Sequence, residues 1–362
     1  MAEALSLAEQ SIALSEPNPR VGCVIVSAGG QVIGRGHTQQ AGGPHAEVMA
    51  LRDAAKHGHS VQGATVVVTL EPCAHHGRTP PCCDALVQAG VGRVAMAIED
   101  PNPLVAGQGA ARLRAAGIEV TSGVGAEAAR ELNIGFFSRM ERKRPWVRLK
   151  VAASLDGRTA LPNGVSQWIT GEAARIDGHA WRRRASAVLT GVGTVIDDNP
   201  RLDVRLVPAP RQPLRVVVDS RLDAPLTARI FESPGSVRVY AASPIAERRT
   251  AFAERGIEVV YVAGTDGKVD LASMLTDLAA RGVNELHVEA GRKLNGSFVR
   301  EGLVDEYLLY IAPKLLGVGL DIASFGPLND LESAVALHFH QIDRIGDDLR
   351  VLARPRTTSH RG

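Results

Sequence analysis

The sequence contains little of several features that define common classes of protein. Only four cysteines and 4% aromatic residues occur among 362 residues, and the formal net charge is +2. Sparse aromatic side chains argue against a stacking platform for single-stranded nucleic acid. Nearly balanced charge leaves no strong field to attract nucleic acid or anionic lipid. We therefore expect no nucleic-acid partner.

Long apolar runs are also lacking, and none is long enough to cross a bilayer. The first residues include the acidic Glu3 where a secretory signal has positive charge, and no long apolar core follows. We therefore expect a cytoplasmic protein without a membrane partner.

The length of the chain predicts two domains, because a single core rarely grows to this size. A charge run at residues 139–145 is interpreted as a solvated connector between residues 1–144 and residues 145–362. On both sides of it, β-branched runs alternate with helical segments. This alternation predicts a three-layer α/β unit in each half.

Three metal-binding side chains and one carboxylate lie in the first half. His45 and Glu47 are two residues apart, and Cys73, preceded by Pro72, and Cys82 follow. A catalytic zinc keeps three protein ligands of the His and Cys type and leaves its fourth position to water. That water falls to a pKa of about 7, and a nearby Glu can move its proton. The pattern indicates hydrolytic deamination of a base.

The local sequence favours this arrangement. Residues 64–70 form an apolar, β-branched run that predicts a buried strand, with Cys73 near its end. Prolines before Cys82 and a glycine at position 90 bracket a short helix, so Cys82 should lie in its first turn. Residues 44–51 are typical of a helix start. Because residues two apart do not share a helix face, His45 can reach the metal while Glu47 reaches the substrate.

Two other interpretations of these side chains remain open. A structural zinc site has four protein ligands, and Cys83 or His75 can in principle complete one, although Glu47 would then have no role. A disulfide between Cys73 and either Cys82 or Cys83 is the second alternative, although nothing else in the sequence indicates an oxidising compartment.

In the second half, three glycine or serine segments follow predicted strands. They are residues 191–193, residues 291–297 between a strand and a helix, and Ser220 with Arg221. Open α/β sheets bind ligands beyond the carboxyl ends of their strands, and a helix N-terminus offers free amides to a phosphate. Each segment taken singly can also be an ordinary turn.

The segment from Glu71 to Cys82 has a longer gap between its cysteines than the two-residue gap of nucleoside and nucleic-acid deaminases. With residues 17–26, 43–47 and 100–103, it closely resembles the deaminase half of the bifunctional riboflavin biosynthesis protein RibD family. The resemblance implies that His45, Cys73 and Cys82 are ligands of one zinc ion per chain and that Glu47 is the proton shuttle. It also implies that Asn18 and His76 contact substrate.

Residues 150–160, 166–170, 193–200 and 312–317 resemble the reductase half of the same family, which uses NADPH on a fold similar to dihydrofolate reductase. The implied cofactor contacts are Ala153, Trp168, Thr194, Asp198, Ser220, Gly291, Arg292, Lys293, Leu294, Asn295, Gly296 and Ser297. The implied substrate contacts are Ser166, Arg182, Leu202, Arg205 and Glu289. The two arginines suit a phosphate by charge and fork geometry. Arg292 and Lys293 stand where many relatives have a smaller pair, and their charge can assist phosphate binding.

We therefore predict an α/β protein with an N-terminal cytidine-deaminase-like three-layer α/β/α domain and a C-terminal dihydrofolate-reductase-like α/β domain. The resemblance implies deamination of 2,5-diamino-6-(5-phosphoribosylamino)pyrimidin-4-one. Reduction of the ribosyl group of 5-amino-6-(5-phosphoribosylamino)uracil to ribityl would follow, with Lys150 and Asp198 as candidates for proton transfer. It also implies a homodimer or homotetramer that assembles through the reductase half. The alternatives are a nucleic-acid base deaminase with an accessory domain and a non-catalytic zinc scaffold.

Overall fold

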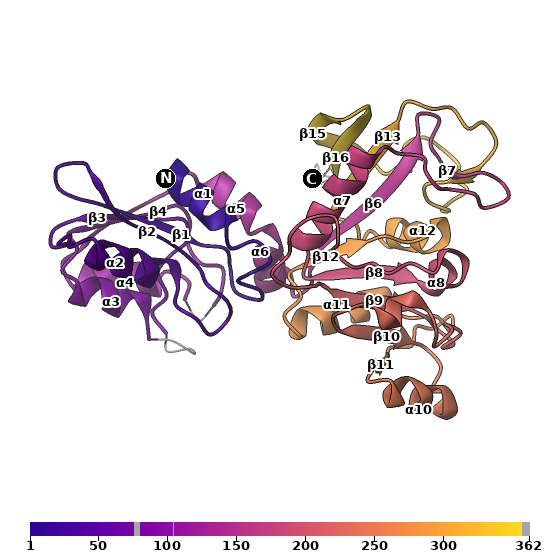
Figure 1. The fold of residues 1–362 in the computed structure, drawn as a ribbon, viewed down its shortest axis with the longest axis horizontal. Helices are drawn as coiled ribbons and strands as arrows, with labels where there is room; N and C mark the ends of the chain where they lie inside the picture. Colours follow the sequence, from indigo (N-terminus) through magenta and orange to yellow (C-terminus); the bar gives the residue numbers. More distant parts are fainter. Residues whose placement is uncertain (76–79, 104, 357–362) are drawn as a thin grey trace. The chain divides into compact units, whose positions relative to one another are not determined.

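The computed structural model describes residues 1–75, 80–103 and 105–356. The chain forms two compact units, Met1–Arg144 and Pro145–Gly362. Among the described helices, none combines the length and the apolar character that crossing a membrane requires. Figure 1 shows a sheet with flanking helices in each unit.

The first unit alternates short strands and helices. Its elements are α1 Ala2–Glu9, β1 Gly22–Val26, β2 Val32–His37, α2 Ala46–Lys56, β3 Thr65–Val68, α3 Cys82–Gln88, β4 Arg93–Met96, α4 Gln108–Ala115, β5 Glu119–Ser122, α5 Ala126–Leu132 and α6 Ile134–Arg142. The strand order is β2-β1-β3-β4-β5. β1 is antiparallel to β2 and β3, whereas β3, β4 and β5 are parallel.

Helices cover both faces of this sheet (Figure 1). A Cβ at Gly22 would meet the Ala4 carbonyl oxygen of α1 at 1.9 Å, and a Cβ at Gly36 would meet the Ala46 carbonyl oxygen of α2 at 2.3 Å. Glycine on the two strands therefore lets both helices pack closely against the sheet. The valines of β3 that alternate inward, Val66 and Val68, are fully buried. The predicted three-layer arrangement is confirmed for this unit.

The predicted solvated connector at residues 139–145 is wrong for most of its length, because Arg139 and Arg142 belong to α6. Phe136 and Phe137 of this helix are buried in the core of the first unit, and the Arg139 guanidinium lies 5.7 Å from the centre of the Phe136 ring. The charges therefore occupy the outer side of an amphipathic helix.

The second unit is built on a larger sheet. Its elements are β6 Trp146–Ser154, β7 Arg158–Ala160, α7 Glu172–Arg184, β8 Ala187–Gly191, α8 Val192–Asp198, β9 Leu214–Val218, α9 Arg229–Glu232, β10 Val237–Ala241, α10 Ala246–Glu254, β11 Glu258–Tyr261, α11 Leu271–Ala280, β12 Glu285–Val288, α12 Arg292–Arg300, β13 Glu306–Ala312, β14 Leu320–Asp321, β15 Leu337–Ile345 and β16 Asp348–Pro355. The strand order is β11-β10-β9-β8-β12-β6-β13-β16-β15. Strands from β11 to β13 are parallel, and β16 and β15 continue the sheet antiparallel.

The two faces of this sheet differ in chemistry. One face carries Val147, Leu149 and Val151 of β6, which pack in a buried cluster with side chains of α11 and α12. On the other face, the register pairs Arg148 of β6 with His287 of β12 and with Glu306 of β13. Trp181 of α7 covers this polar face, and its ring lies 4.3 Å from the Arg148 guanidinium. Because side chains alternate along a strand, Lys150 and Glu289 lie on the polar face too.

Candidate functional site

His45, Cys73 and Cys82 come together from three segments of the first unit. His45 is the N-cap of α2, Cys73 lies in the loop after β3, and Cys82 is the first residue of α3. The sequence predicted Cys82 in the first turn of a helix, and the structure confirms it. The ligand atoms of the three side chains all lie within 4.8 Å of one another.

The distances between these groups suit one small metal ion. His45 Nδ1 lies 3.3 Å from Cys82 Sγ and 3.6 Å from Cys73 Sγ, and the Cys82 backbone N–H donates to Cys73 Sγ at 3.4 Å. A set of one imidazole and two thiolates is typical of zinc, which binds such ligands tetrahedrally. Three protein ligands leave the fourth position for water, so the donor set fits a catalytic zinc.

The surroundings favour a thiolate at Cys73. Its pKa is lowered, first because the Cys82 thiol donates a hydrogen bond to its sulfur and also because His45 is adjacent. The same hydrogen bond and burial raise the pKa of Cys82. The hydrogen bond and charge of the Cys73 sulfur also raise the pKa of His45. Since a metal binds the thiolate form, these contacts favour the form of Cys73 that a metal binds.

Glu47 lies in the first turn of α2 and is 3% exposed. Burial, followed by the negative charge of Cys73, raises its pKa to about 7. A carboxyl group whose pKa lies near neutrality can both accept and return a proton. The arrangement therefore combines a metal-binding triad with a buried proton carrier.

The alternative roles of the cysteines do not match this geometry. All four cysteines are free thiols, so neither disulfide considered from the sequence forms. The Cys83 thiol donates to the Pro72 carbonyl oxygen at 3.1 Å, away from the cluster. His75 is also not part of the cluster found among the described residues.

Of the two predicted substrate contacts of this unit, the structure describes one. Asn18 is half-buried in a turn, where its backbone N–H donates to the Ser15 carbonyl oxygen at 2.9 Å. His76 lies outside the described residues. Sequence reasoning also overlooked Glu71, a buried carboxylate two residues before Cys73 that accepts three backbone hydrogen bonds. No periodicity reveals such a residue, because its partners lie far along the chain.

In the second unit, the predicted cofactor segments meet at the carboxyl ends of neighbouring parallel strands. Gly191 ends β8 and Gly291 precedes α12, just beyond β12. A Cβ at Gly191 would lie 3.1 Å from Leu294 Cδ2, and one at Gly291 would lie 3.5 Å from Thr194 Oγ1. Ser220 follows β9, the next strand of the sheet. These segments therefore line one edge, where open α/β sheets bind ligands.

The expectation that residues 291–297 lie between a strand and a helix is wrong, because α12 begins at Arg292. The Asn295 N–H already donates to the Gly291 carbonyl oxygen, so only the amides before it are free to face an anion. Asn295 is buried and donates to the Ile322 carbonyl oxygen at 3.0 Å, and a Cβ at Gly296 would meet the Ser324 carbonyl oxygen at 1.9 Å. Asn295 and Gly296 thus pack against residues 322–324, while Ser297 is half-buried in the same helix.

A charged cluster forms on the polar face of the sheet. The guanidinium of Arg182, from α7, forms a two-pronged ion pair with Glu289, and Lys150 Nζ lies 3.7 Å from Glu289 Oε2. Although burial opposes ionisation, these cations hold the pKa of Glu289 well below its usual range. Arg182 also donates to the Asp203 carbonyl oxygen at 3.0 Å, so few of its donors remain for a phosphate.

The other predicted contacts of this unit occupy varied positions. Arg205 is half-exposed and pairs with Asp203 at 2.6 Å, while Leu202 is buried with a φ of 52°. Ala153 is buried on β6, and Trp168 is exposed beneath the Arg175 guanidinium at 4.6 Å. Ser166 is half-buried and precedes this tryptophan by two residues. Asp198 lies exposed at the end of α8. Partial loss of hydration, and then the negative charge of Asp197, raise its pKa.

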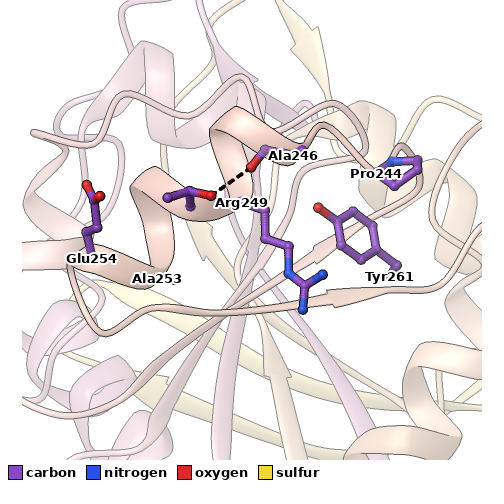
Figure 2. Close-up of a pocket in the computed structure, with 7 residues that line it drawn as sticks. Pro244, Ala246, Arg249, Ala253, Glu254 and Tyr261 are labelled. Atoms are coloured by element: carbon purple, nitrogen blue, oxygen red, sulfur yellow. Dashed lines mark hydrogen bonds between the residues drawn. The ribbon is translucent and has the colours of Figure 1, made fainter.

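A separate cavity of about 470 Å³ lies between α10 and the edge strand β11 (Figure 2). Its lining includes Pro244, Arg249 and Tyr261, with the Arg249 guanidinium 5.8 Å from the centre of the Tyr261 ring. None of its lining residues is among the predicted cofactor or substrate contacts. The chemistry therefore does not point to this cavity.

Comparison with known proteins agrees with both units. A family model described as the cytidine and deoxycytidylate deaminase zinc-binding region matches residues 1–98, and one described as the RibD C-terminal domain matches residues 145–351. The riboflavin biosynthesis protein RibD of Aquifex aeolicus is 42% identical over 346 residues, covering 96% of this chain and 95% of the relative. The RibD of Escherichia coli is 43% identical over 362 residues and covers 96% of each.

Solved structures agree over the whole chain. An Acinetobacter baumannii RibD structure is 41% identical, with a TM-score of 0.88, covering 98% of this chain and 97% of that one. A diaminohydroxyphosphoribosylaminopyrimidine deaminase/5-amino-6-(5-phosphoribosylamino)uracil reductase from Thermotoga maritima is 36% identical, with the same TM-score of 0.88 and the same coverages of 98% and 97%. These matches confirm the predicted fold class in both halves. The chain therefore belongs to the RibD family, and it is a bifunctional enzyme of riboflavin biosynthesis with an N-terminal deaminase domain and a C-terminal reductase domain.

Proposed function

We propose that the first unit deaminates 2,5-diamino-6-(5-phosphoribosylamino)pyrimidin-4-one and that the second reduces the resulting 5-amino-6-(5-phosphoribosylamino)uracil to its ribityl form. The observation that carries the first step is the convergence of His45, Cys73 and Cys82 beside the buried Glu47. The substrates named for the Thermotoga maritima relative support both assignments.

In the deaminase unit, His45, Cys73 and Cys82 hold one zinc ion per chain. When bound, zinc lowers the pKa of water to about 7 and so supplies hydroxide to attack the ring carbon that bears the amino group. Glu47 accepts the proton of the attacking water and gives it to the ring nitrogen; it then takes the proton of the new hydroxyl group on the ring carbon and gives it to the departing amine. Its burial against Cys73 supports this role, because its raised pKa keeps both directions of transfer accessible. Asn18 and His76 contact the substrate.

In the reductase unit, NADPH binds along the carboxyl edge of β9, β8 and β12. The free amides at the start of α12 and the cations Arg292 and Lys293 suit its phosphates. Thr194, Ser220, Ala153, Trp168 and Asp198 complete the contacts. The cofactor supplies the hydride, which the open-chain Schiff base of the substrate receives at C1.

Substrate binds to the polar face beside Glu289. Arg205 offers a half-exposed guanidinium to the substrate phosphate, and Arg182 shares in this binding while it orients Glu289. Ser166 and Leu202 complete the contacts. Lys150 and Asp198 remain the candidates for proton transfer, and the cluster favours Lys150, since Glu289 holds its ammonium group on this face.

The same chain assembles, we propose, into a homodimer or homotetramer through the reductase unit and works in the cytoplasm. The edge strand β15 supports self-association, because its Phe339 and Ile342 side chains are 71% and 53% exposed. The free thiols of Cys73 and Cys82 support a reducing compartment. Sedimentation of the purified protein tests the assembly, and a purely monomeric species would contradict it.

One experiment tests both activities. The diaminopyrimidine precursor and NADPH are mixed with the pure protein, and ammonia and NADP are measured together. We expect ammonia in the absence of NADPH and consumption of NADPH only after deamination. Ammonia without any later NADPH oxidation would remove the reductase assignment, and neither product would remove both.

We expect the Lys150→Met variant to lower the reductase kcat by about 10²–10⁴-fold, the range for loss of a general acid. The Asp198→Asn variant should change kcat much less, because the Asp198 carboxylate is exposed at the end of α8. NADPH oxidation with the deaminated substrate measures both rates, and ammonia release by the same preparations is the control. The reverse order of effects would transfer the proton role to Asp198.

A further inference from the structure

Glu71 is a buried carboxylate that the proposed mechanism does not use. It is 3% exposed and lies two residues before Cys73. Its Oε2 accepts hydrogen bonds from the backbone N–H groups of Asp100 at 3.2 Å and Gly107 at 2.9 Å, and its Oε1 accepts one from Ala110 at 2.9 Å. Burying a charge is costly without such donors, so this carboxylate and these amides stabilise each other.

The three donors belong to the approach to α4 and its first turn. The amides at the start of a helix have no partner within the helix, and a polar side chain at the N-cap usually accepts from them. Here the N-cap is Gly107, which has no side chain. Glu71 therefore supplies the missing acceptor from a distant part of the chain, and its negative charge also suits the helix dipole.

Close packing links this cap to the backbone that carries Cys73. A Cβ at Gly109 would lie 2.0 Å from the Pro72 carbonyl oxygen, so the first turn of α4 directly contacts this stretch. From the other side, the Cys83 thiol donates to the Pro72 carbonyl oxygen at 3.1 Å, and the Cys83 N–H donates to the Cys73 carbonyl oxygen at 3.2 Å. The segment from Glu71 to Cys73 is thus held between the first turns of α3 and α4.

We infer that Glu71 is a positioning residue for the metal site: by capping α4 across the chain, it fixes the backbone that presents the Cys73 sulfur. The inference rests on the proposed function, in which Cys73 is a zinc ligand. Glu47 would act on the reacting atoms, whereas Glu71 acts only through Cys73.

The Glu71→Gln variant tests this role with little change in shape. Either orientation of the amide places an NH₂ group against at least one backbone N–H, so one or two of the three hydrogen bonds are lost. Loss of support around a metal ligand typically weakens binding about 10–100-fold. We expect zinc to transfer to a chromogenic chelator at least about tenfold faster than from the unmodified protein, within that range.

The Glu99→Gln variant is the matched control, because Glu99 is exposed and directly precedes Asp100, one of the three residues that donate to Glu71. It should release zinc at the unmodified rate. The melting transition of the deaminase unit, measured by calorimetry on the same samples, reports whether each variant has folded.

A second measurement uses the unmodified protein. Coupling between two sites is reciprocal, so removal of zinc should speed hydrogen exchange at the amides of Gly107 and Ala110. The amides of Leu275 and Leu278, in α11 of the other unit, should exchange unchanged. Hydrogen exchange therefore tests the positioning role of Glu71 even if the Glu71→Gln variant does not fold.

The outcomes distinguish the proposed deaminase function from the positioning role of Glu71. An unmodified protein that binds no zinc would remove the proposed deaminase function, whatever Glu71 does. One zinc per chain with equal release rates from the unmodified and Glu71→Gln proteins would overturn the positioning role alone. Equal hydrogen-exchange rates at the amides of Gly107 and Ala110 with and without zinc would overturn the positioning role as well.

Discussion

The Glu47→Gln variant should lose ammonia release almost completely while it keeps its zinc. Gln has nearly the same shape, so α2 and the neighbouring His45 should stay in place. It cannot accept the proton of the attacking water or return one to the leaving amine. Loss of a general acid-base group lowers the rate by about 10²–10⁴-fold, and here one carboxylate serves more than one transfer. Steady-state ammonia release and metal content, measured on the same preparation, check the prediction.

Two controls accompany the Glu47 variant. The Glu9→Gln variant makes the same chemical change on the exposed side of α1 and should leave ammonia release unaltered. NADPH oxidation with the deaminated substrate should be normal in both variants, because the reductase chemistry belongs to the second unit. Near-normal ammonia release from the Glu47→Gln variant would refute its role as proton carrier.

The Cys73→Ser variant should lose most of its zinc on dialysis. A serine hydroxyl stays protonated at neutral pH and is a poor zinc ligand, whereas the neighbours of Cys73 lower the pKa of its thiol and favour the thiolate that zinc binds. Metal content by atomic emission should fall from one zinc per chain toward zero, and ammonia release should fall with it.

A bound metal also stabilises the fold that binds it, by about 2.7 kcal/mol when the free ion is a hundredfold above its Kd. Calorimetry should therefore show earlier melting of the deaminase unit in the Cys73→Ser variant. The Cys83→Ser variant is the matched control, since its thiol donates to the Pro72 carbonyl oxygen and a hydroxyl can do the same. Retention of one zinc per chain by Cys73→Ser would remove Cys73 from the ligand set.

Local sequence patterns predicted most of the elements that carry the site. The β-branched run before Cys73 became β3, and the prolines before Cys82 marked the start of α3. These predictions succeed because strand alternation and helix start signals act over a few neighbouring residues. The same patterns failed at residues 139–145 and 291–297, which are largely helical. Burial of Phe136 stabilises the helix that includes residues 139–142, and burial of Phe298 stabilises the helix that begins at Arg292. In both segments this packing outweighs the local preference of charged or glycine-containing sequence for a loop.

By itself, the sequence determined the chemistry that this protein has available: a zinc ligand set with a carboxylate beside it, and two α/β halves with glycine turns after their strands. Only the tertiary structure decided which groups meet. The pairing of Arg182 with Glu289 and the capping of α4 by Glu71 each join residues far apart in the chain. A buried charge needs an opposite charge or a hydrogen-bond donor as its partner. Which group is near enough to be that partner depends on how the helices pack on the sheet, and a local sequence pattern does not contain this information.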